Sequence, residues 1–294
     1  MHALLVEARR QRRPLKQVLV AAGAVTPYQL ALIEAGKLDG LAIGPFRVVD
    51  RIRQTPYEAI YRVLDPRRGQ EALLRHLGED AALDAVLPDE YRQRFTRLIL
   101  PDAHVAGVLE VLELDNRPAI VQEWLIGLPA SDWPPLAAAP GVCYRLLTQA
   151  ALGLSALHKQ SLVHGRLSEQ NLILTPQGIL KLRGANEPGW LTGTAEVAAT
   201  VADDLLALGQ IVSGWCTPTG VRKGSKTKPL PEKMLAILRR LQSTGDDAYP
   251  NVRALLDDLD QASADVPANP EAWDRLIRHV RDHAQPEAIL RQSA

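Results

Sequence analysis

Residues 162–174 read LVHGRLSEQNLIL, and this stretch decides the fold because of the elements on either side of it. A long amphipathic helix is predicted before it, since CYRLLTQAALGLSALHKQ (143–160) has apolar residues at spacings of three and four. Two very short strands, NLILT and ILKLR, are predicted around the turn Pro176-Gln177-Gly178. A strongly apolar helix, DDLLALGQIVSGW, follows at 203–215. A helix, a loop, a small hairpin and a buried helix are therefore expected in this order.

The residues before the long helix predict a small antiparallel sheet. Short β-branched and aromatic runs mark its strands: FRVVDRI, EAIYRVLD, EALLRHL, VAGVLEVLEL and PAIVQEWL. Residues 88–100 have a helical pattern, and Asp115-Asn116 is a turn signal between the last two runs. We expect a five-strand antiparallel meander interrupted by one helix.

Helices are also predicted at both ends of the chain. Residues 1–40 read as a helical appendage, with one helix ending at Gly23 and the next running from Thr26-Pro27 to Gly36. Later helices are MLAILRRLQS, NVRALLDDLDQA and, in a tail from residue 264, PEAWDRLIRHVRDH. The basic segment TPTGVRKGSKTKPLPEK (217–233) is interpreted as a solvated surface loop, with a docking patch for an acidic partner as the alternative.

Composition excludes several classes of protein. The 294 residues carry 34 Lys and Arg against 34 Asp and Glu, which gives no electrostatic case for nucleic-acid binding by the whole chain. The two cysteines cannot build a disulfide framework, and no apolar run reaches the roughly 18–20 residues that span a bilayer, so we expect a cytoplasmic protein without membrane contact. HVRDH lacks the glutamate of a zinc-protease helix, and no zinc spacing, nucleophile elbow or Walker loop occurs.

The order of elements and the loop at 162–174 resemble the protein-kinase family over about residues 44–262. GPFRVVDRI is similar to the first kinase strand, EALLRHL to the third, ILKLRGAN to the metal-binding turn and DDLLALG to the helix that supports the catalytic loop. The resemblance implies an α+β, bilobal fold, with a hinge at Glu123, Trp124 and Leu125. The implied parts are an appendage (1–40), an N-lobe (41–126), a C-lobe with a shortened activation segment (127–263) and a helical tail (264–294). The appendage is similar to a segment that precedes some bacterial Ser/Thr kinase domains.

The glycine-rich loop of the family is not retained. Its three glycines fall on Arg53, Thr55 and Glu58, whereas glycine lets backbone amides approach a phosphate closely. Pro56 removes one further amide donor, and Glu58 places a negative charge where phosphates would lie.

The ion pair of the family is also altered. The phosphate-binding lysine of the third strand is replaced by Arg75, which is charged but has a longer and planar head. An alternative is that Arg75 is only a surface arginine. The helix glutamate that pairs with this lysine falls near Gln93, with Glu90 one turn earlier.

The catalytic loop and the metal-binding turn lack their reactive groups. His164 is retained, but the family's Arg-Asp falls on Gly165 and Arg166, and a guanidinium cannot accept a proton from a substrate hydroxyl. The following lysine falls on Ser168. Asn171 remains, yet the Asp-Phe-Gly motif reads Gly184-Ala185-Asn186, so the main metal ligand is missing. We expect His164 to be a packed core histidine and Asn171 to tie the loop together.

Structural positions of the family survive better than chemical ones. Residues 187–203 are too few for a full activation segment, and its terminal glutamate and the arginine that pairs with it, here Ala248, are absent together. Asp204 matches the aspartate that accepts catalytic-loop amides in the family. This selective pattern predicts a folded chain without phosphoryl-transfer chemistry.

The resemblance therefore implies an inactive pseudokinase that binds another protein, such as an active kinase or a signalling complex, without a cofactor or metal. An alternative is a nucleotide or anion sensor or transferase that uses Arg53, Arg75, Arg166 and Arg183. A third is recruitment by residues 1–40 alone. For the leading interpretation we expect Glu58, or failing it Glu90, to pair with Arg75, with little open volume above the hinge.

Overall fold

The structure, a computed structural model, describes residues 2–84, 86–136, 139–192, 198–216 and 230–284. The chain divides into two compact units. The sheet unit comprises residues 1–92 and 109–124, and the helical unit comprises residues 93–108 and 125–294. The junction at Trp124 and Leu125 falls within the stretch that resembles a kinase hinge.

The sheet unit contains a six-stranded sheet with the order β1-β2-β3-β4-β6-β5. Its strands are β1 (Ala42–Ile43), β2 (Phe46–Gln54), β3 (Glu58–Asp65), β4 (Gln70–Leu77), β5 (Val108–Leu114) and β6 (Arg117–Glu123). The expected meander is wrong in one respect, because β6 and not β5 pairs with β4, antiparallel, through Leu74 and Val121. Alternation of apolar and polar residues identifies a strand, but it does not determine which strand pairs with it when a long connection lies between them. Asp115 and Asn116 both have positive φ, as the tight turn between β5 and β6 requires.

One apolar cluster holds the sheet together. Its buried members come from the start of β2 and the middle of β3, β4 and β6: Phe46, Val48, Val63, Ala72, Leu74, Ala119 and Val121. These are mostly β-branched or aromatic residues in alternating positions, which pack well on a pleated surface. Each completely buried side chain of this kind contributes about 1.5–3 kcal/mol through its removal from water.

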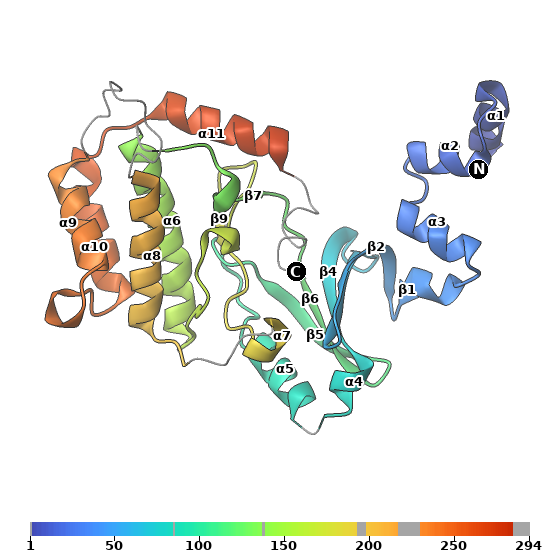
Figure 1. The fold of residues 1–294 in the computed structure, drawn as a ribbon, viewed down its shortest axis with the longest axis horizontal. Coiled ribbons are helices and arrows are strands. Elements are labelled where there is room, and N and C mark those ends of the chain that lie inside the picture. Colours follow the sequence, from blue (N-terminus) through green and yellow to red (C-terminus); the bar gives the residue numbers. More distant parts are fainter. Residues whose placement is uncertain (1, 85, 137–138, 193–197, 217–229, 285–294) are drawn as a thin grey trace. The chain divides into compact units, whose positions relative to one another are not determined.

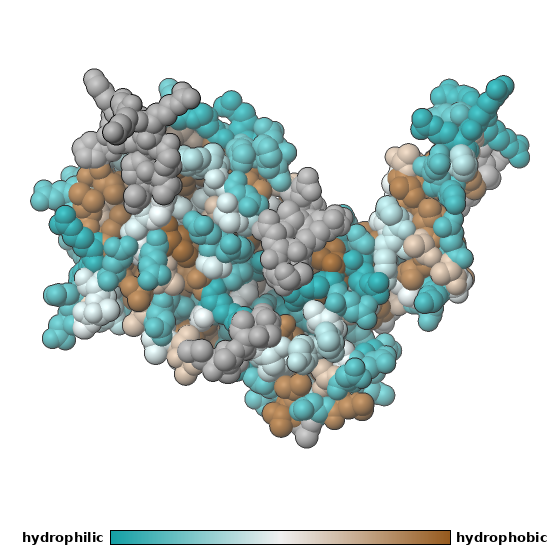
Figure 2. Space-filling view, in the orientation of Figure 1, coloured by the Kyte–Doolittle hydropathy of each residue, from teal (hydrophilic) through white to brown (hydrophobic). Residues whose placement is uncertain are grey.

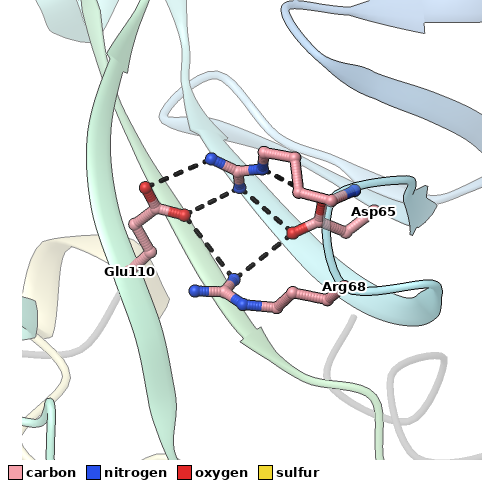
Figure 3. A network of polar contacts seen from close by, with 4 residues as sticks. Asp65, Arg68 and Glu110 are labelled. Carbon is pink, nitrogen blue, oxygen red and sulfur yellow. Dashed lines mark hydrogen bonds and ion pairs between the residues drawn. The ribbon is translucent and has the colours of Figure 1, made fainter.

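A polar network ties the β3–β4 turn to β5 (Figure 3). Asp65 is fully buried and accepts bonds from the backbone and side chain of Arg67, and from Arg68 at 3.3 Å. Arg67 also reaches Glu110 of β5 at 2.7 Å. The guanidinium bonds hold the pKa of Asp65 below its usual range. The network therefore links the β3–β4 turn to β5 across the intervening strand β6.

The N-terminal helices form a run that ends on the edge of the sheet. They are α1 (His2–Gln11), α2 (Leu15–Ala21), α3 (Pro27–Glu34) and the 3-10 turn η1 (Leu38–Leu41). Thr26 caps α3, donates its hydroxyl to the Val49 carbonyl at 2.6 Å, and Gln29 donates to the Val48 carbonyl at 2.8 Å. The cap thus fastens α3 to β2. Apolar surface is visible over α2 and α3 in Figure 2, and Ile33 and Leu38 are exposed. The sequence analysis did not resolve α1 as a separate helix.

The remaining elements are α4 of the sheet unit, α5, and the helices, short strands and 3-10 turns of the helical unit. They are α4 (Glu79–Ala82), α5 (Leu87–Thr96), β7 (Leu128–Pro129), η2 (Ala130–Asp132), α6 (Pro140–Lys159), η3 (Glu169–Asn171), β8 (Leu172–Leu174), β9 (Leu180–Leu182), α7 (Gly189–Thr192), α8 (Val201–Cys216), α9 (Glu232–Leu241), η4 (Gly245–Asp247), α10 (Val252–Ala262), η5 (Ser263–Asp265) and α11 (Pro270–His283). Helix α5 begins in the sheet unit and ends in the helical unit.

In the helical unit, α6 and α8 run side by side, with α9 and α10 beside them (Figure 1). The faces that meet are apolar, and Leu146, Leu154 and Leu208 have no exposed surface. The predicted hairpin is present as β8 and β9, where Leu172 pairs with Leu182. The expected basic loop at 217–233 lies largely outside the described residues.

Candidate functional site

The centre of the sheet unit holds a buried ion pair between two strands. Arg75 of β4 donates Nε to Glu58 Oε2 at 2.9 Å and Nη2 to Glu58 Oε1 at 2.8 Å. The strands place the two residues close together, because Arg75 pairs with Ile60, two residues after Glu58. The Glu58 side chain has no exposed surface and that of Arg75 has 4%. The expected pairing of these residues is therefore present, and the alternative of a surface arginine is wrong.

Two further side chains complete this cluster, which we call the Glu58 cluster (Arg53, Glu58, Arg75 and Tyr91). Arg53 of β2 donates Nη2 to Glu58 Oε1 at 3.1 Å. The Tyr91 hydroxyl of α5 donates to Glu58 Oε2 at 3.1 Å, and Tyr91 is fully buried. One carboxylate thus receives bonds from two guanidinium groups and a phenol, which favours its charged form in a dry site.

Tyr91 was missed by the sequence analysis. The alignment of this helix with the kinase family was uncertain by one turn. The family's glutamate was therefore assigned near Gln93, with Glu90 as the position one turn earlier. In the structure Gln93 is exposed and Glu90 is half-buried, whereas Tyr91 points at the cluster. The available signal was a large aromatic residue on the apolar face of α5, four residues before the buried Phe95.

The turn between β2 and β3 uses its own backbone amides. The Thr55 amide donates to the Glu58 carbonyl at 2.9 Å, and the amides of Tyr57 and Glu58 donate to the Thr55 hydroxyl at 3.3 and 3.1 Å. Pro56 has no amide hydrogen. Every backbone donor from residue 55 to 58 is therefore engaged within the turn, and none is left to cradle a phosphate.

The residues that resemble a hinge have ordinary packing roles. Glu123 ends β6, and the Trp124 ring lies under the Arg62 guanidinium at 5.3 Å, a cation–π contact within the sheet unit. Leu125 is buried against Ile173 in the helical unit. The expectation of little open volume above this segment stays a prediction.

In the helical unit, Asp204 of α8 organises the loop at 162–174. Its carboxylate accepts the amides of His164 at 2.8 Å and Gly165 at 2.9 Å, and it contacts His158 Nε2 of α6 at 2.9 Å. Asp204 is 2% exposed. The structure thus places this residue as the sequence analysis expected, as a buried acceptor that fixes the loop backbone.

Asn171 and Gly184 lie together, and neither supplies a carboxylate. Asn171 donates Nδ2 to the Arg166 carbonyl at 2.8 Å and accepts Arg183 Nη2 at Oδ1 at 3.5 Å. A Cβ on Gly184 would lie 3.6 Å from Asn171 Oδ1, so an aspartate there would adjoin the amide. Glycine supplies no oxygen ligand from a side chain. Within the described residues, no group of three or more His, Cys, Asp or Glu side chains is arranged to hold a metal ion.

The other residues of the loop are held by burial and by backbone hydrogen bonds. His164 is 1% exposed, and burial lowers the pKa of its imidazole although Asp204 opposes the effect. Gly165 has a φ of 73°, a left-handed conformation that favours glycine. The Ser168 carbonyl accepts the Asn171 amide at 3.0 Å, and Asn186 donates its amide to the His164 carbonyl at 3.1 Å. Ala248 is half-buried beside η4 and offers no charge to an ion pair.

Comparison with known proteins finds sequence similarity to serine/threonine-protein kinases. No family model matches the chain. The serine/threonine-protein kinase Pkn1 of Myxococcus xanthus is 24% identical over 264 residues, which cover 81% of this chain and 38% of Pkn1. The DNA damage-responsive serine/threonine-protein kinase RqkA of Deinococcus radiodurans is 29% identical over 152 residues, 48% of this chain and 22% of RqkA. The chain therefore spans well under half the length of these relatives.

Solved structures agree on the fold. The kinase domain of Mycobacterium tuberculosis PknI matches with a TM-score of 0.51 and 22% identity, over 76% of this chain and 98% of that domain. Its C20A_R136N double mutant gives a TM-score of 0.52. The fold is thus that of a protein kinase, α+β with a sheet lobe and a helical lobe. Bacterial Ser/Thr kinases are thus among the proteins that this chain resembles in sequence. No helix in the described part of the chain is both long and apolar enough to cross a membrane.

Proposed function

We propose that this chain is a catalytically inactive, kinase-like domain that acts by binding another protein, as a scaffold or an allosteric partner. It transfers no phosphoryl group and binds ATP and magnesium weakly or not at all. Its partner is a protein such as an active kinase or a component of a signalling complex.

The observation that carries this proposal is the Glu58 cluster. In an active kinase the space beside the third-strand lysine receives nucleotide phosphates, and the glycine-rich loop covers them with amides. Here a buried carboxylate occupies the third glycine position and takes both Nε and Nη2 of Arg75. A phosphate would have to displace Glu58 from two guanidinium groups and would gain no free amide in residues 55–58.

The helical unit supports the same proposal. The position of the catalytic base is Arg166, whose guanidinium stays protonated, and that of the metal-binding aspartate is Gly184. Transition-state stabilisation by charge and metal supplies most of the rate in phosphoryl transfer. Asp204 and Asn171, by contrast, hold the loop backbone in place, so the fold is maintained without these groups.

The test is a thermal-unfolding titration of the full chain with ATP, with magnesium and with both. A ligand at 100 times its dissociation constant stabilises the native state by about 2.7 kcal/mol, which is a readily measured shift in melting temperature. We expect no shift that requires ATP and magnesium together. An assay for phosphate incorporation into the chain itself and into a general protein substrate should stay at background, with an active Ser/Thr kinase domain measured in parallel.

A melting shift that needs both ATP and magnesium would contradict the proposal, and so would phosphate incorporation above background. The variant Glu58→Ala is the matched comparison, because it removes the carboxylate and leaves Arg75 in place. Stabilisation of this variant by inorganic phosphate, with none in the wild type, would identify Glu58 as the group that occupies the phosphate position.

A further inference from the structure

The two cysteines of the chain lie together in the helical unit. Cys143 is in the first turn of α6, and Cys216 is the last residue of α8. These helices run side by side in Figure 1. The two side chains are close enough for each thiol to shift the pKa of the other, and neither cysteine is in a disulfide.

The surroundings of the two thiols differ. Cys143 is 1% exposed, and its Sγ also lies 3.9 Å from the Leu136 carbonyl. Cys216 is half-exposed at the end of its helix. A small solute in water therefore meets Cys216 first, while Cys143 is shielded behind it.

The pKa shifts also differentiate the thiols chemically. The adjacent Cys143 thiol lowers the pKa of Cys216, whereas Cys216 and burial raise the pKa of Cys143. The thiolate is the nucleophile of cysteine chemistry. Exposure and ionisation thus both favour Cys216 as the first sulfur to react.

We propose that Cys143 and Cys216 form a peroxide-reactive thiol pair, in which Cys216 is oxidised first and Cys143 then closes an intramolecular disulfide. Nothing in the kinase-like site takes part in this reaction. The co-reactant is hydrogen peroxide or another small hydroperoxide.

The reaction has two steps. The Cys216 thiolate attacks one peroxide oxygen, so an S–O bond forms, the O–O bond breaks, and the departing hydroxide takes up a proton as water. The sulfur of Cys143 then attacks the Cys216 sulfenic acid: the S–S bond forms, the S–O bond breaks, and hydroxide leaves with the proton of the Cys143 thiol as a second water. Both sulfurs are oxidised, and one peroxide is reduced to two waters.

The disulfide would fasten a helix pair that is already joined elsewhere. His158 of α6 contacts Asp204 of α8 at 2.9 Å, near the other ends of the same two helices. A cross-link from Cys143 to Cys216 closes a long loop and restricts the unfolded chain. Oxidation should therefore raise the melting temperature of the full chain by about 5 °C or more.

The experiment treats the reduced full chain with a small excess of hydrogen peroxide and then labels the remaining thiols with a maleimide under denaturing conditions. Intact mass should show two labels before oxidation, and afterwards no label and the loss of two hydrogens. The product should remain monomeric on a non-reducing gel, melt at a higher temperature, and regain both labels after dithiothreitol. In Cys143→Ser, a sulfenic acid should accumulate at Cys216 and react with dimedone. In Cys216→Ser, Cys143 should keep its maleimide label.

Three results would overturn the proposal. They are two labels retained by the wild type after peroxide, a disulfide that joins separate chains, and equal oxidation of Cys143 in the Cys216→Ser variant. A lower melting temperature after oxidation would also reject it, because the bond would then require the helices to move apart from their native packing.

Discussion

At the scale of single residues, Glu58 is the acceptor at the centre of the buried polar cluster of the sheet unit. Most buried polar groups keep a structure stable only if all their partners remain, because a lone buried charge costs far more than a paired one gains. Glu58 accepts bonds from three side chains, and Arg75 donates two bonds to it. The pair is therefore sensitive to the loss of either member.

The variant Glu58→Gln should lower the free energy of unfolding by about 3–5 kcal/mol, because it removes the buried carboxylate charge that binds Arg75 at two nitrogens. Urea denaturation followed by circular dichroism measures this change. The control is Glu71→Gln, since Glu71 binds Arg62 at 2.6 Å in the same sheet with both side chains partly exposed. It should cost about 0–1 kcal/mol. Equal losses in the two variants would show that burial of the Glu58 cluster has no energetic consequence.

Asp204 offers a second comparison between neighbouring carboxylates. Asp204→Ala should reduce stability by about 1–3 kcal/mol or more, because the buried amides of His164 and Gly165 lose their acceptor. Asp203→Ala is the control, since Asp203 is exposed and only bonds Thr200 at the start of α8. Thermal melts of both variants provide the measurement. An Asp204 variant that melts no lower than the Asp203 variant would contradict the role assigned to Asp204.

At the scale of elements, a hydrogen bond from Tyr91 to Glu58 attaches α5 to the sheet. In active kinases a glutamate of the corresponding helix pairs with the third-strand lysine, and the position of the helix controls activity. Here Glu58 of β3 pairs with Arg75 of β4, and α5 contributes the hydroxyl of Tyr91 to the same carboxylate. The Glu58–Arg75 pair thus joins two strands of the sheet.

Tyr91→Phe should therefore loosen α5 without breaking the ion pair. The expected loss is about 1.5–3 kcal/mol, the range for a hydrogen bond to a charged acceptor. Hydrogen exchange should increase in α5 and remain unchanged in β3 and β4. Tyr61→Phe is the control, because no hydrogen bond from its hydroxyl is recorded among the described residues. An equal rise of hydrogen exchange in β4 would show that the attachment of α5 and the Glu58–Arg75 ion pair are coupled, which would contradict this prediction.

Elements that depend on interactions between residues close in sequence could be predicted, whereas features that depend on contacts between distant residues could not. Helices such as α6 and α8 follow from local periodicity, and the turn at Asp115-Asn116 from local backbone preference. The β4–β6 pairing did not, since it depends on packing across a connection that includes α5. The Glu58–Arg75 pair was predicted because strand pairing in a kinase fold brings the two positions together, whereas Tyr91 required the register of α5. The proximity of Cys143 and Cys216 required the packing of α6 on α8.

At the scale of the whole molecule, buried histidines predict how stability depends on pH. Burial lowers the pKa of His164 and of His76 below the usual value. In the unfolded chain both return to near 6.5, so below that pH the unfolded state binds more protons than the native state. The contribution of the two neutral histidines to the free energy of unfolding is complete above about pH 7. It is lost as the pH falls, by at most about 1.4 kcal/mol per pH unit for each histidine.

Urea denaturation between pH 5 and 7.5 should thus show stability rising with pH. His164→Asn should flatten this dependence, whereas replacement of the exposed His279 by Asn should leave it unchanged. A stability profile without slope between pH 5 and 7, or one that His164→Asn does not alter, would be inconsistent with a neutral buried His164.

The Glu58–Arg75 pair also bears on how such a chain can evolve. A change of Glu58 to glycine alone would recreate one element of a phosphate loop but remove the carboxylate that pairs with a buried guanidinium, at a cost of about 3–5 kcal/mol. A change of Arg75 to lysine alone would keep a carboxylate in the phosphate position. Since proteins are only about 5–15 kcal/mol more stable than their unfolded state, the first step alone removes a large part of that margin. Under the proposed function, a descendant of this sequence would therefore need two coupled substitutions, at Glu58 and Arg75, before this position could accept a phosphate.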